Sequence, residues 1–382
     1  MNRDRQQEIA AESIAALKDA EERVRTTDLQ MRALFLQRLE ALRALACWKK
    51  ERGLPAEDRE LEQRTLSELT PGVEEEAQRS FYLSFLQDVL TVGTRWQHYL
   101  MEGLRVAYSG VEGAFGHIAA MRIFPDGTKI PYPSFEDAYS AVEKGECDLA
   151  VLPIENSYAG EVGQVLDLMF SGNLHVNGVY DLPVTQNLLG LPGAKAEDIR
   201  TVISHPQALA QCYRYVRECG YEVVEMSNTA LAAQYVADLN DPSVAAIASA
   251  EAAAIYGLEV LERRVNTSSG NTTRFATFTR TRNIPAGRNR MDEHFILVFT
   301  VANEAGSLAK TLNIIGSHGF NMCNLHSRPM KELMWNYYFF VELEGNVNTP
   351  DGEDLMLQLG SVCEKLKLLG TYKRDSFPAS EE

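Results

Sequence analysis

Basic residues are in short supply in this sequence, where 37 Lys and Arg stand against 53 Asp and Glu and leave a net charge of −16. Nucleic-acid-binding proteins need a positive surplus to neutralise phosphates, so the composition argues against that class. Long apolar runs are missing too, since none approaches the ~18 residues that cross a bilayer. The polar residues 1–13 contain no apolar segment of the signal-peptide kind. We expect a cytoplasmic protein with neither nucleic acid nor membrane as its partner.

Cysteine is also sparse, with six residues scattered along the chain and no C-x-x-C pair. This pattern predicts free thiols and no metal site, and nothing in the sequence calls for a cofactor. The 382 residues, 45% hydrophobic and 24% charged, are typical of a soluble globular protein with about two or three domains. An anionic ligand would need locally placed positive potential, from helix N-termini or a few Arg and Lys.

The first hundred residues predict three helices. Glycine and proline are absent from residues 4–52, and segments 53–55 and 70–72 then interrupt a helical pattern that resumes over 74–101. A first helix of about 45 residues would span ~70 Å, more than the other two can cover. We therefore expect this module to form a homodimer or a higher homo-oligomer that buries its apolar stripe.

Beyond residue 103, short apolar runs alternate with helical stretches, which predicts α/β structure with mainly parallel strands. Residues 179–191 interrupt the alternation and are a candidate passage between two lobes. A polar linker at 280–293 leads to a β-α-β-β-α order, with its last helix expected over 352–369 and a frayed tail after it. The expected domains are an all-α three-helix domain at 1–101, a two-lobed α/β domain at 104–281 and a ferredoxin-like α+β domain at 292–372.

Three strand-to-helix junctions of the middle domain share one character. They lie at 109–117, 153–163 and 203–212, and each carries Gly, Ser or Asn just before a helix. Free backbone N–H groups and the positive end of the helix dipole meet there, at the carboxyl ends of strands where α/β sheets bind ligands. Helix capping explains each junction taken alone. Three together, with the stretch 270–278, favour an anion-binding site.

The stretch 270–278, GNTTRFATF, sets an amide, a hydroxyl and a guanidinium at the start of a strand. If it is extended, Thr273 and Phe275 share one face, whereas Thr272 and Arg274 share the other. Two interpretations stay open. Either the motif lies in the loop before the strand, or Thr273 serves chemistry while Arg274 braces the neighbouring structure.

These motifs resemble those of prephenate dehydratases in order and spacing, namely VAYSGVEGAFGHIAA, LPIENSYAGEV, SHPQALAQC, AAIASAEAAAIYGLEVL and NTTRF. The C-terminal GSLAKTL and HSRP resemble an ACT regulatory domain, and with its helical N-terminus the chain is similar to bifunctional chorismate mutase–prephenate dehydratases. The resemblance implies conversion of prephenate to phenylpyruvate with loss of water and carbon dioxide, in L-phenylalanine biosynthesis. It implies Thr273 as the catalytic group, which we interpret as a hydrogen-bond donor to the leaving oxygen. The implied prephenate-binding residues are Gly113, Asn156, Ser157, Ser204, His205, Gln207, Arg274 and Phe275.

The long helix carries Arg38 and Lys49 on one face, about three turns apart along an otherwise apolar stripe. Either Lys49 snorkels at the helix end and Arg38 pairs with an acid, or both hold a dianion inside the bundle. The resemblance to helical chorismate mutases implies the second, with a chorismate site made of Arg38, Lys49, Asp58, Glu62 and Gln97. Glu21, Leu61 and Gly93 replace two arginines and a serine of that family. We therefore expect the mutase fold with impaired activity.

The resemblance to ACT domains implies L-phenylalanine as an allosteric effector, bound between copies of the chain. The implied effector residues are Gly306, Ser307, Leu308, Ala309, His326, Ser327, Arg328 and Pro329. His326 stands where the family usually has glutamate, so we expect feedback to be weaker or carried by other residues.

Two rival interpretations remain. A two-lobed sensor of small molecules, joined to a dimerisation module, would also use helix N-termini, although binding alone does not require Thr273 in its TRF motif. A monofunctional dehydratase whose N-terminal module only dimerises is favoured by Glu21 and Leu61 and opposed by Arg38 and Lys49.

Overall fold

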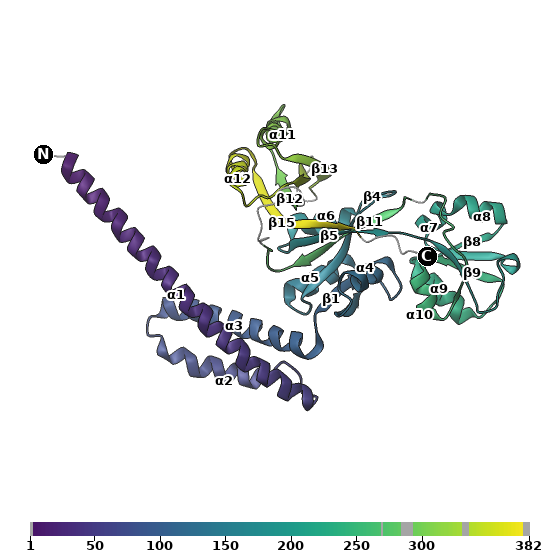
Figure 1. The fold of residues 1–382 in the computed structure, drawn as a ribbon, viewed down its shortest axis with the longest axis horizontal. Coiled ribbons are helices and arrows are strands. Elements are labelled where there is room, and N and C mark those ends of the chain that lie inside the picture. Colours follow the sequence, from purple (N-terminus) through teal and green to yellow (C-terminus); the bar gives the residue numbers. More distant parts are fainter. Residues whose placement is uncertain (1–2, 269, 284–292, 331–335, 377–382) are drawn as a thin grey trace. The chain divides into compact units, whose positions relative to one another are not determined.

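The computed structural model describes residues 3–268, 270–283, 293–330 and 336–376, which form two compact units, Met1–Leu104 and Arg105–Glu382 (Figure 1). Unit 1 is helical throughout its described part, whereas unit 2 is built on two sheets. None of the described helices has both the length and the apolarity that a membrane span requires.

Unit 1 contains the three predicted helices and a short 3-10 turn: α1 (Arg3–Glu51), α2 (Arg59–Leu69), η1 (Thr70–Gly72) and α3 (Glu76–Glu102). Gly53 follows α1 with a φ of +62°, and the Asp58 carboxylate caps α2 by accepting from the Leu61 amide. α1 extends well beyond α2 and α3 (Figure 1). Several apolar side chains of α1 stay more than half exposed, namely Ile14, Leu17, Val24 and Leu34. Their burial in an oligomer stays a prediction.

The first lobe of unit 2 combines a sheet with three helices. Its strands are β1 (Arg105–Ser109), β2 (Thr128–Tyr132), β3 (Leu149–Asn156), β4 (Gly160–Glu161), β5 (His175–Pro183) and β11 (Thr272–Thr279). Its helices are α4 (Phe115–Ile123), α5 (Phe135–Lys144) and α6 (Gly163–Ser171). The strand order β5-β11-β3-β1-β2 buries both faces of the central strands, which explains their continuous apolar runs.

The second lobe has a five-stranded sheet in the order β10-β6-β9-β7-β8. Its strands are β6 (Asn187–Gly190), β7 (Thr201–Ser204), β8 (Glu222–Glu225), β9 (Val244–Ala248) and β10 (Glu259–Glu262). Its helices are η2 (Ala196–Asp198), α7 (Pro206–Gln211), α8 (Tyr213–Cys219), α9 (Thr229–Leu239) and α10 (Ala250–Tyr256). The chain passes from β5 to β6 within residues 179–191, which confirms the predicted passage between lobes. It returns from β10 to β11.

The expectation of mainly parallel strands is wrong. Strands β1, β2 and β3 are parallel, as are β7, β8 and β9, but β11 is antiparallel to both β3 and β5. The reason is the double passage between the lobes: β5 carries the chain out and β11 brings it back beside it, so the two run in opposite directions. Strand β6 is likewise antiparallel to β9 and β10.

The C-terminal segment of unit 2 has the order β-α-β-β-α-β. Its elements are β12 (Glu293–Thr300), α11 (Ser307–Ser317), β13 (Asn321–Pro329), β14 (Tyr337–Glu344), α12 (Pro350–Val362) and β15 (Lys365–Ser376). The strand order β13-β14-β12-β15 is ferredoxin-like. The helix expected over 352–369 ends at Val362, and the supposed tail continues strand β15 up to Ser376. Most of the predicted linker, residues 284–292, lies outside the described residues.

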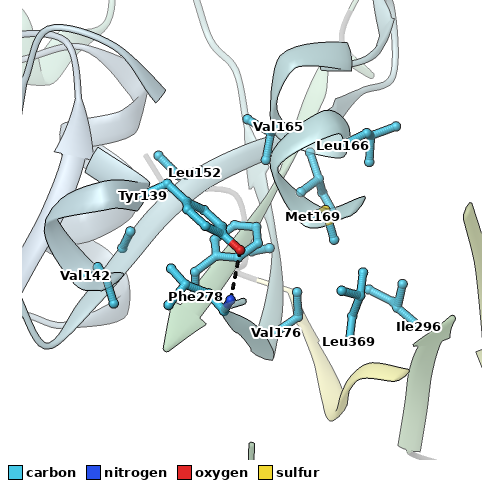
Figure 2. Close-up of a cluster of buried hydrophobic side chains, with 14 of the residues drawn as sticks. Tyr139, Val142, Leu152, Val165, Leu166, Met169, Val176, Phe278, Ile296 and Leu369 are labelled. Atoms are coloured by element: carbon cyan, nitrogen blue, oxygen red, sulfur yellow. Dashed lines mark hydrogen bonds between the residues drawn. The ribbon is translucent and has the colours of Figure 1, made fainter. Parts of the chain in front are cut away.

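Strand β15 joins the C-terminal segment to the first lobe. After pairing with β12 it continues beside β5 in parallel, so that one sheet runs from β13 to β2. Ile296 and Leu369 pack into the same buried cluster as Met169 and Val176 of the first lobe (Figure 2). The other face of this segment's sheet packs on α11 and α12. The segment is therefore anchored by both a backbone ladder and an apolar core.

Candidate active site

A cleft of about 470 Å³ lies between the two lobes of unit 2. The described residues that line it include no Asp, Glu, Lys or Arg. Its polar lining consists of hydroxyls, amides and one imidazole, from Ser109, Asn156, Gln186, His205, Gln207, Gln211, Ser227, Asn228, Thr229 and Thr273. Its apolar lining includes Phe115, Phe135, Pro153, Val162, Val184 and Phe275. Such a cleft can bind an anion through side-chain N–H and O–H donors and through backbone dipoles.

Five helices, α4, α5, α6, α7 and α9, have their N-cap or a first-turn residue in the lining of this cleft. The first residues of α4, α7 and α9 line it, so their unpaired N–H groups and positive dipole ends are available there. The N-cap of α4 is Ala114, which gives no side-chain cap, so the amides of its first turn keep their donor capacity. Gly116 lets α4 approach β1 closely, since a Cβ there would lie 2.9 Å from the Ser109 carbonyl oxygen. The helix N-termini thus supply local positive potential to the cleft, although the net charge of the chain is −16.

Thr273 is oriented by a buried amide network. The Nδ2 of Asn156 donates to Thr273 Oγ1 over 2.8 Å and to Asn271 Oδ1 over 2.9 Å. Oδ1 of Asn156 accepts from the Tyr158 and Ala159 amides, which fixes the direction of its side chain. Because the Thr273 oxygen accepts from Asn156, its own proton is left to donate elsewhere. Thr273 is 9% exposed, and its face of β11 lines the cleft.

Arg274 lies on the other side of β11, as strand alternation predicts. Its guanidinium donates to Glu342 over 2.7 and 2.8 Å and to Glu155 over 3.1 Å, and Asp181 lies 3.5 Å from Nε. Burial opposes the charge of Arg274, but the hydrogen bonds and charge of Glu342 raise its pKa. The same partnership outweighs burial and lowers the pKa of Glu342. Arg274 therefore lies outside the cleft lining as a brace between strands, and its assignment to prephenate binding stays a prediction.

The structure brings together five of the nine residues assigned to the dehydratase site. Thr273, Asn156, His205, Gln207 and Phe275 line the cleft.

Three further assignments besides Arg274 fall outside the cleft lining. Ser204 is fully buried and donates to the Ile247 carbonyl, so it serves the second lobe's core. Gly113 has a φ of +80°, and its amide donates to Nδ1 of His117. Gly113 is therefore a turn residue. Ser157 donates to the Gly270 carbonyl and lines a separate polar hollow beside Arg274.

Asn228 and Thr229 are the main residues missed by sequence reasoning. They open α9 beside the cleft, where the Asn228 side chain caps the helix by accepting from the Ala230 amide over 2.8 Å. The segment 224–231, VEMSNTAL, has the same strand-to-helix character as the three junctions at 109–117, 153–163 and 203–212. Counting that fourth junction would have found them. Gln211 lies in the SHPQALAQC motif four residues after Gln207, so helical spacing would have found it, whereas Gln186 had no comparable signal because only the fold brings it to the cleft.

The residues assigned to effector binding do not share one face of the C-terminal sheet. Gly306 precedes α11 with a φ of +89°, and Ser307, Leu308 and Ala309 form its first turn. His326 and Arg328 face the first lobe instead: His326 lies within 4.0 Å of Glu155 and Glu161, and Arg328 donates to Asp167 over 3.1 Å. Ser327 and Pro329 alternate with them along β13.

The residues assigned to a chorismate site in unit 1 lie along the contacts of its three helices. Arg38 donates to the Val89 carbonyl oxygen, with its guanidinium beside Gly93, and burial lowers its pKa. Lys49, only 5% exposed, donates to the Ala56 carbonyl oxygen over 2.8 Å. Neither cation has a carboxylate partner among the described residues.

The other members of this set differ in their contacts. Glu62 accepts from the Thr94 hydroxyl, and Asp58 serves as the N-cap of α2. Gln97 is 5% exposed, and its Oε1 has no hydrogen-bond partner among the described residues. Lys49 is buried and Arg38 has no carboxylate partner among the described residues. Snorkelling of Lys49 and acid pairing of Arg38 are therefore both contradicted.

No group of three or more His, Cys, Asp or Glu in the described ranges is arranged to hold a metal ion.

The sequence of this chain is similar to a family model and to known proteins. Residues 106–283 match the family model described as prephenate dehydratase. Arogenate dehydratase 1 of Petunia hybrida is 36% identical over 72% of this chain and 68% of its own length. A bifunctional chorismate mutase/prephenate dehydratase of Aquifex aeolicus is 32% identical over 72% of this chain and 75% of its own.

The fold of this chain also matches a solved structure. The prephenate dehydratase of Arthrobacter aurescens, in complex with L-Phe, matches with a TM-score of 0.66 and 28% identity, over 71% of this chain and 90% of that one. The two-lobed cleft lined by Thr273 and the relatives together show that this chain belongs to the prephenate dehydratase family.

Proposed function

We propose that the chain converts prephenate to phenylpyruvate, water and carbon dioxide. Prephenate carries a carboxylate and a hydroxyl at opposite ring positions. Loss of the carboxylate as carbon dioxide leaves its electron pair to the ring, and the hydroxyl departs from the far position as the ring becomes aromatic. One proton joins the departing hydroxide to form water. The observation that carries this proposal is the Asn156–Thr273 pair, which leaves the threonine proton free to donate.

Thr273 acts in this scheme by hydrogen bonding to the departing oxygen. A threonine hydroxyl is too weak an acid to lose its proton outright near neutral pH, so it stabilises the developing hydroxide while solvent supplies the proton. A preorganised donor of this kind is typically worth about 10²–10³ in rate. Loss of the hydroxyl should therefore nearly abolish turnover without abolishing binding.

The lining of the cleft favours prephenate over arogenate. The two compounds differ in the side chain, which carries a ketone in prephenate and an ammonium group in arogenate. The described cleft lining offers no carboxylate to an ammonium group, whereas its amides, hydroxyls and helix N-termini suit a keto acid. Since the relatives' names include both substrates, this difference calls for a direct test.

The test is to give the purified chain prephenate and, separately, arogenate, and to measure phenylpyruvate and phenylalanine. We expect kcat/KM for prephenate to exceed that for arogenate by at least about tenfold, the effect of ~1.4 kcal/mol of binding discrimination. A preference for arogenate would overturn the substrate assignment. No turnover of either compound would overturn the enzyme assignment and revive the two-lobed sensor.

A second candidate function belongs to unit 1. Arg38 and Lys49 are cations without carboxylate partners among the described residues, and the nearby Gln97 Oε1 is unpaired in the same part of the chain. These groups favour an anionic ligand such as chorismate, as in the bifunctional relative. Formation of phenylpyruvate from chorismate would support this function. Turnover of prephenate alone would leave unit 1 as a dimerisation module.

L-Phenylalanine is the proposed effector, because a related dehydratase was crystallised with it. The first turn of α11, from Ser307, offers N–H groups to a carboxylate. His326 is turned toward Glu155 and Glu161 and not toward α11, so the ammonium contact would come from other residues. Calorimetric titration with L-phenylalanine tests this proposal, and absence of binding would refute it.

A further inference from the structure

The chain neighbours of Thr273 and Asn156 contact each other on the opposite face of the sheet. Strands β11 and β3 pair in a register that sets Thr273 opposite Asn156 and Arg274 opposite Glu155. The first pair faces the cleft, and the second pair forms a hydrogen bond of 3.1 Å on the opposite face. Each residue of the proposed catalytic pair therefore has a chain neighbour in the salt bridge behind it.

The backbone pairing of β3 with β11 is irregular at this point. The register between β3 and β11 shifts directly after Arg274, where Phe275 pairs with Pro153 and leaves Ile154 as the extra residue of a bulge. A bulge interrupts the ladder and bends its strand, so the β3–β11 pairing is irregular next to Thr273 and Asn156, although β11 keeps a regular register with β5 from Thr272 to Thr277.

The C-terminal segment supplies the rest of the support. Glu342 of β14, whose side chain is 1% exposed, receives two hydrogen bonds from the Arg274 guanidinium. The Tyr372 hydroxyl donates to Glu342 over 2.6 Å, which fixes that carboxylate in turn. Asn324 of β13 donates to Glu155 over 3.1 Å. Both members of the rear pair are thus held from outside the first lobe.

The charge of Glu342 can be removed by substitution because Arg274 has other carboxylates beside it. Glu155, Asp181 and Glu342 all lie within 3.5 Å of the guanidinium, and His294 lies 3.7 Å from Glu342. Removing the charge of Glu342 leaves Arg274 with two other carboxylates, so no buried cation is stranded. A variant at this position is therefore expected to fold.

We propose that Glu342 is a positioning residue for the dehydratase reaction. It acts through Arg274 and the bulged β11–β3 pair to keep the Thr273 hydroxyl and the Asn156 amide in the geometry that the departing oxygen requires. This inference rests on the proposed prephenate dehydratase function. It assigns to the C-terminal segment a part in catalysis that does not depend on any effector.

The test compares Glu342→Gln with a control at the other polar tether between the same two parts of unit 2. In that tether Asp167 of α6 accepts from Arg328 and from the Tyr338 hydroxyl over 2.8 Å. Asp167→Asn weakens it without touching β3 or β11. We expect Glu342→Gln to lower kcat on prephenate by about ten- to a hundredfold, with KM within about threefold of wild type, as for a small misplacement of a catalytic group. Asp167→Asn should stay within about twofold of wild type.

A double variant and a conservative variant separate positioning from general stability. In Thr273→Ala/Glu342→Gln the second change should cost little more than Thr273→Ala alone, because both act on one interaction. Glu342→Asp should recover part of kcat. If Glu342→Gln fails to fold, Asn324→Ala takes its place, with a smaller loss of kcat expected.

Three outcomes would overturn the inference while wild-type turnover of prephenate leaves the proposed function intact. They are an unchanged kcat for Glu342→Gln, equal losses in Glu342→Gln and Asp167→Asn, and fully additive losses in the double variant. Absence of wild-type turnover would overturn the proposed function and this inference together.

Discussion

The amide of Asn156 donates to the hydroxyl of Thr273 over 2.8 Å, and the register of β3 against β11 sets the two residues directly opposite each other. The pair decides which way the threonine proton points. Removing either member therefore has a distinct expected effect.

Thr273→Ala should lower kcat on prephenate by about 10²–10³, because the donor to the departing oxygen is lost. Thr273→Ser should keep part of the activity, since its hydroxyl can still accept from Asn156. Steady-state kinetics on both variants checks this expectation. An Ala variant within a few-fold of wild type would show that Thr273 has no catalytic part.

Asn156→Asp should be more harmful than Asn156→Ala. A carboxylate at this position accepts from the Thr273 hydroxyl and so withdraws the proton that the departing oxygen needs, while its charge repels an anionic substrate. The matched control is Asn177, whose Nδ2 donates to Thr279 at the far end of β11 over 2.6 Å. Asn177→Asp should leave kcat near wild type. Equal losses at both positions would point to strand stability and not to the cleft.

Gly370→Ala should lower the melting temperature markedly. A Cβ at Gly370 would lie 1.8 Å from the Val176 carbonyl oxygen, so the approach of β15 to β5 excludes any side chain there. Gly360 in α12 provides the control, since a Cβ there meets nothing within 4 Å and Ala is favoured in helices by about 0.5–1 kcal/mol. Differential scanning calorimetry should show opposite shifts. A Gly370→Ala protein as stable as wild type would contradict the observed packing.

Lys367 should make stability depend on alkaline pH. Its ammonium donates to the Met169 and Gly172 carbonyls at the end of α6, and burial, assisted by Lys365, lowers its pKa to about 8 from 10.5. Between these values the unfolded chain binds more protons than the folded one, so this group makes folding more favourable as pH rises from about 8 to about 10.5. Below that range the cost of burying the charge is fully present.

The measurement for Lys367 is the melting temperature of wild type and of Lys367→Met across that pH range. The difference, wild type minus variant, should increase as pH rises through about 8 and level off near 10.5. A constant difference would show that Lys367 titrates alike in both states.

Strand alternation was enough to separate Thr273 from Arg274, because β11 is regular at those two residues. The same rule fits β15, where Leu366 and Leu368 alternate with Lys365 and Lys367, whereas the sequence prediction assigns this segment to the end of a helix. The pairing of β11 between β3 and β5 could not be predicted from sequence, because it depends on where the chain returns from the second lobe.

The sequence predicts which junctions form the cleft better than it predicts which side chains line it. Junctions before α4 and α7 contribute to it because their strands end at its edge, and Asn156 contributes from the third. Ser204 sits at such a junction yet turns inward to the Ile247 carbonyl, a choice set by the core of the second lobe. Local pattern identifies a junction, and packing then decides which of its side chains meet the ligand.

The ladder between β15 and β5 also bears on how this protein can be divided. In the whole chain β5 is covered on both sides, by β11 and by β15. A shortened chain ending at residue 283 would turn β5 into a bare edge with unpaired N–H and C=O groups, and would expose apolar side chains such as Val176. Such a fragment should recruit strands from its neighbours and precipitate, so the first lobe behaves as an incomplete sheet that the C-terminus finishes.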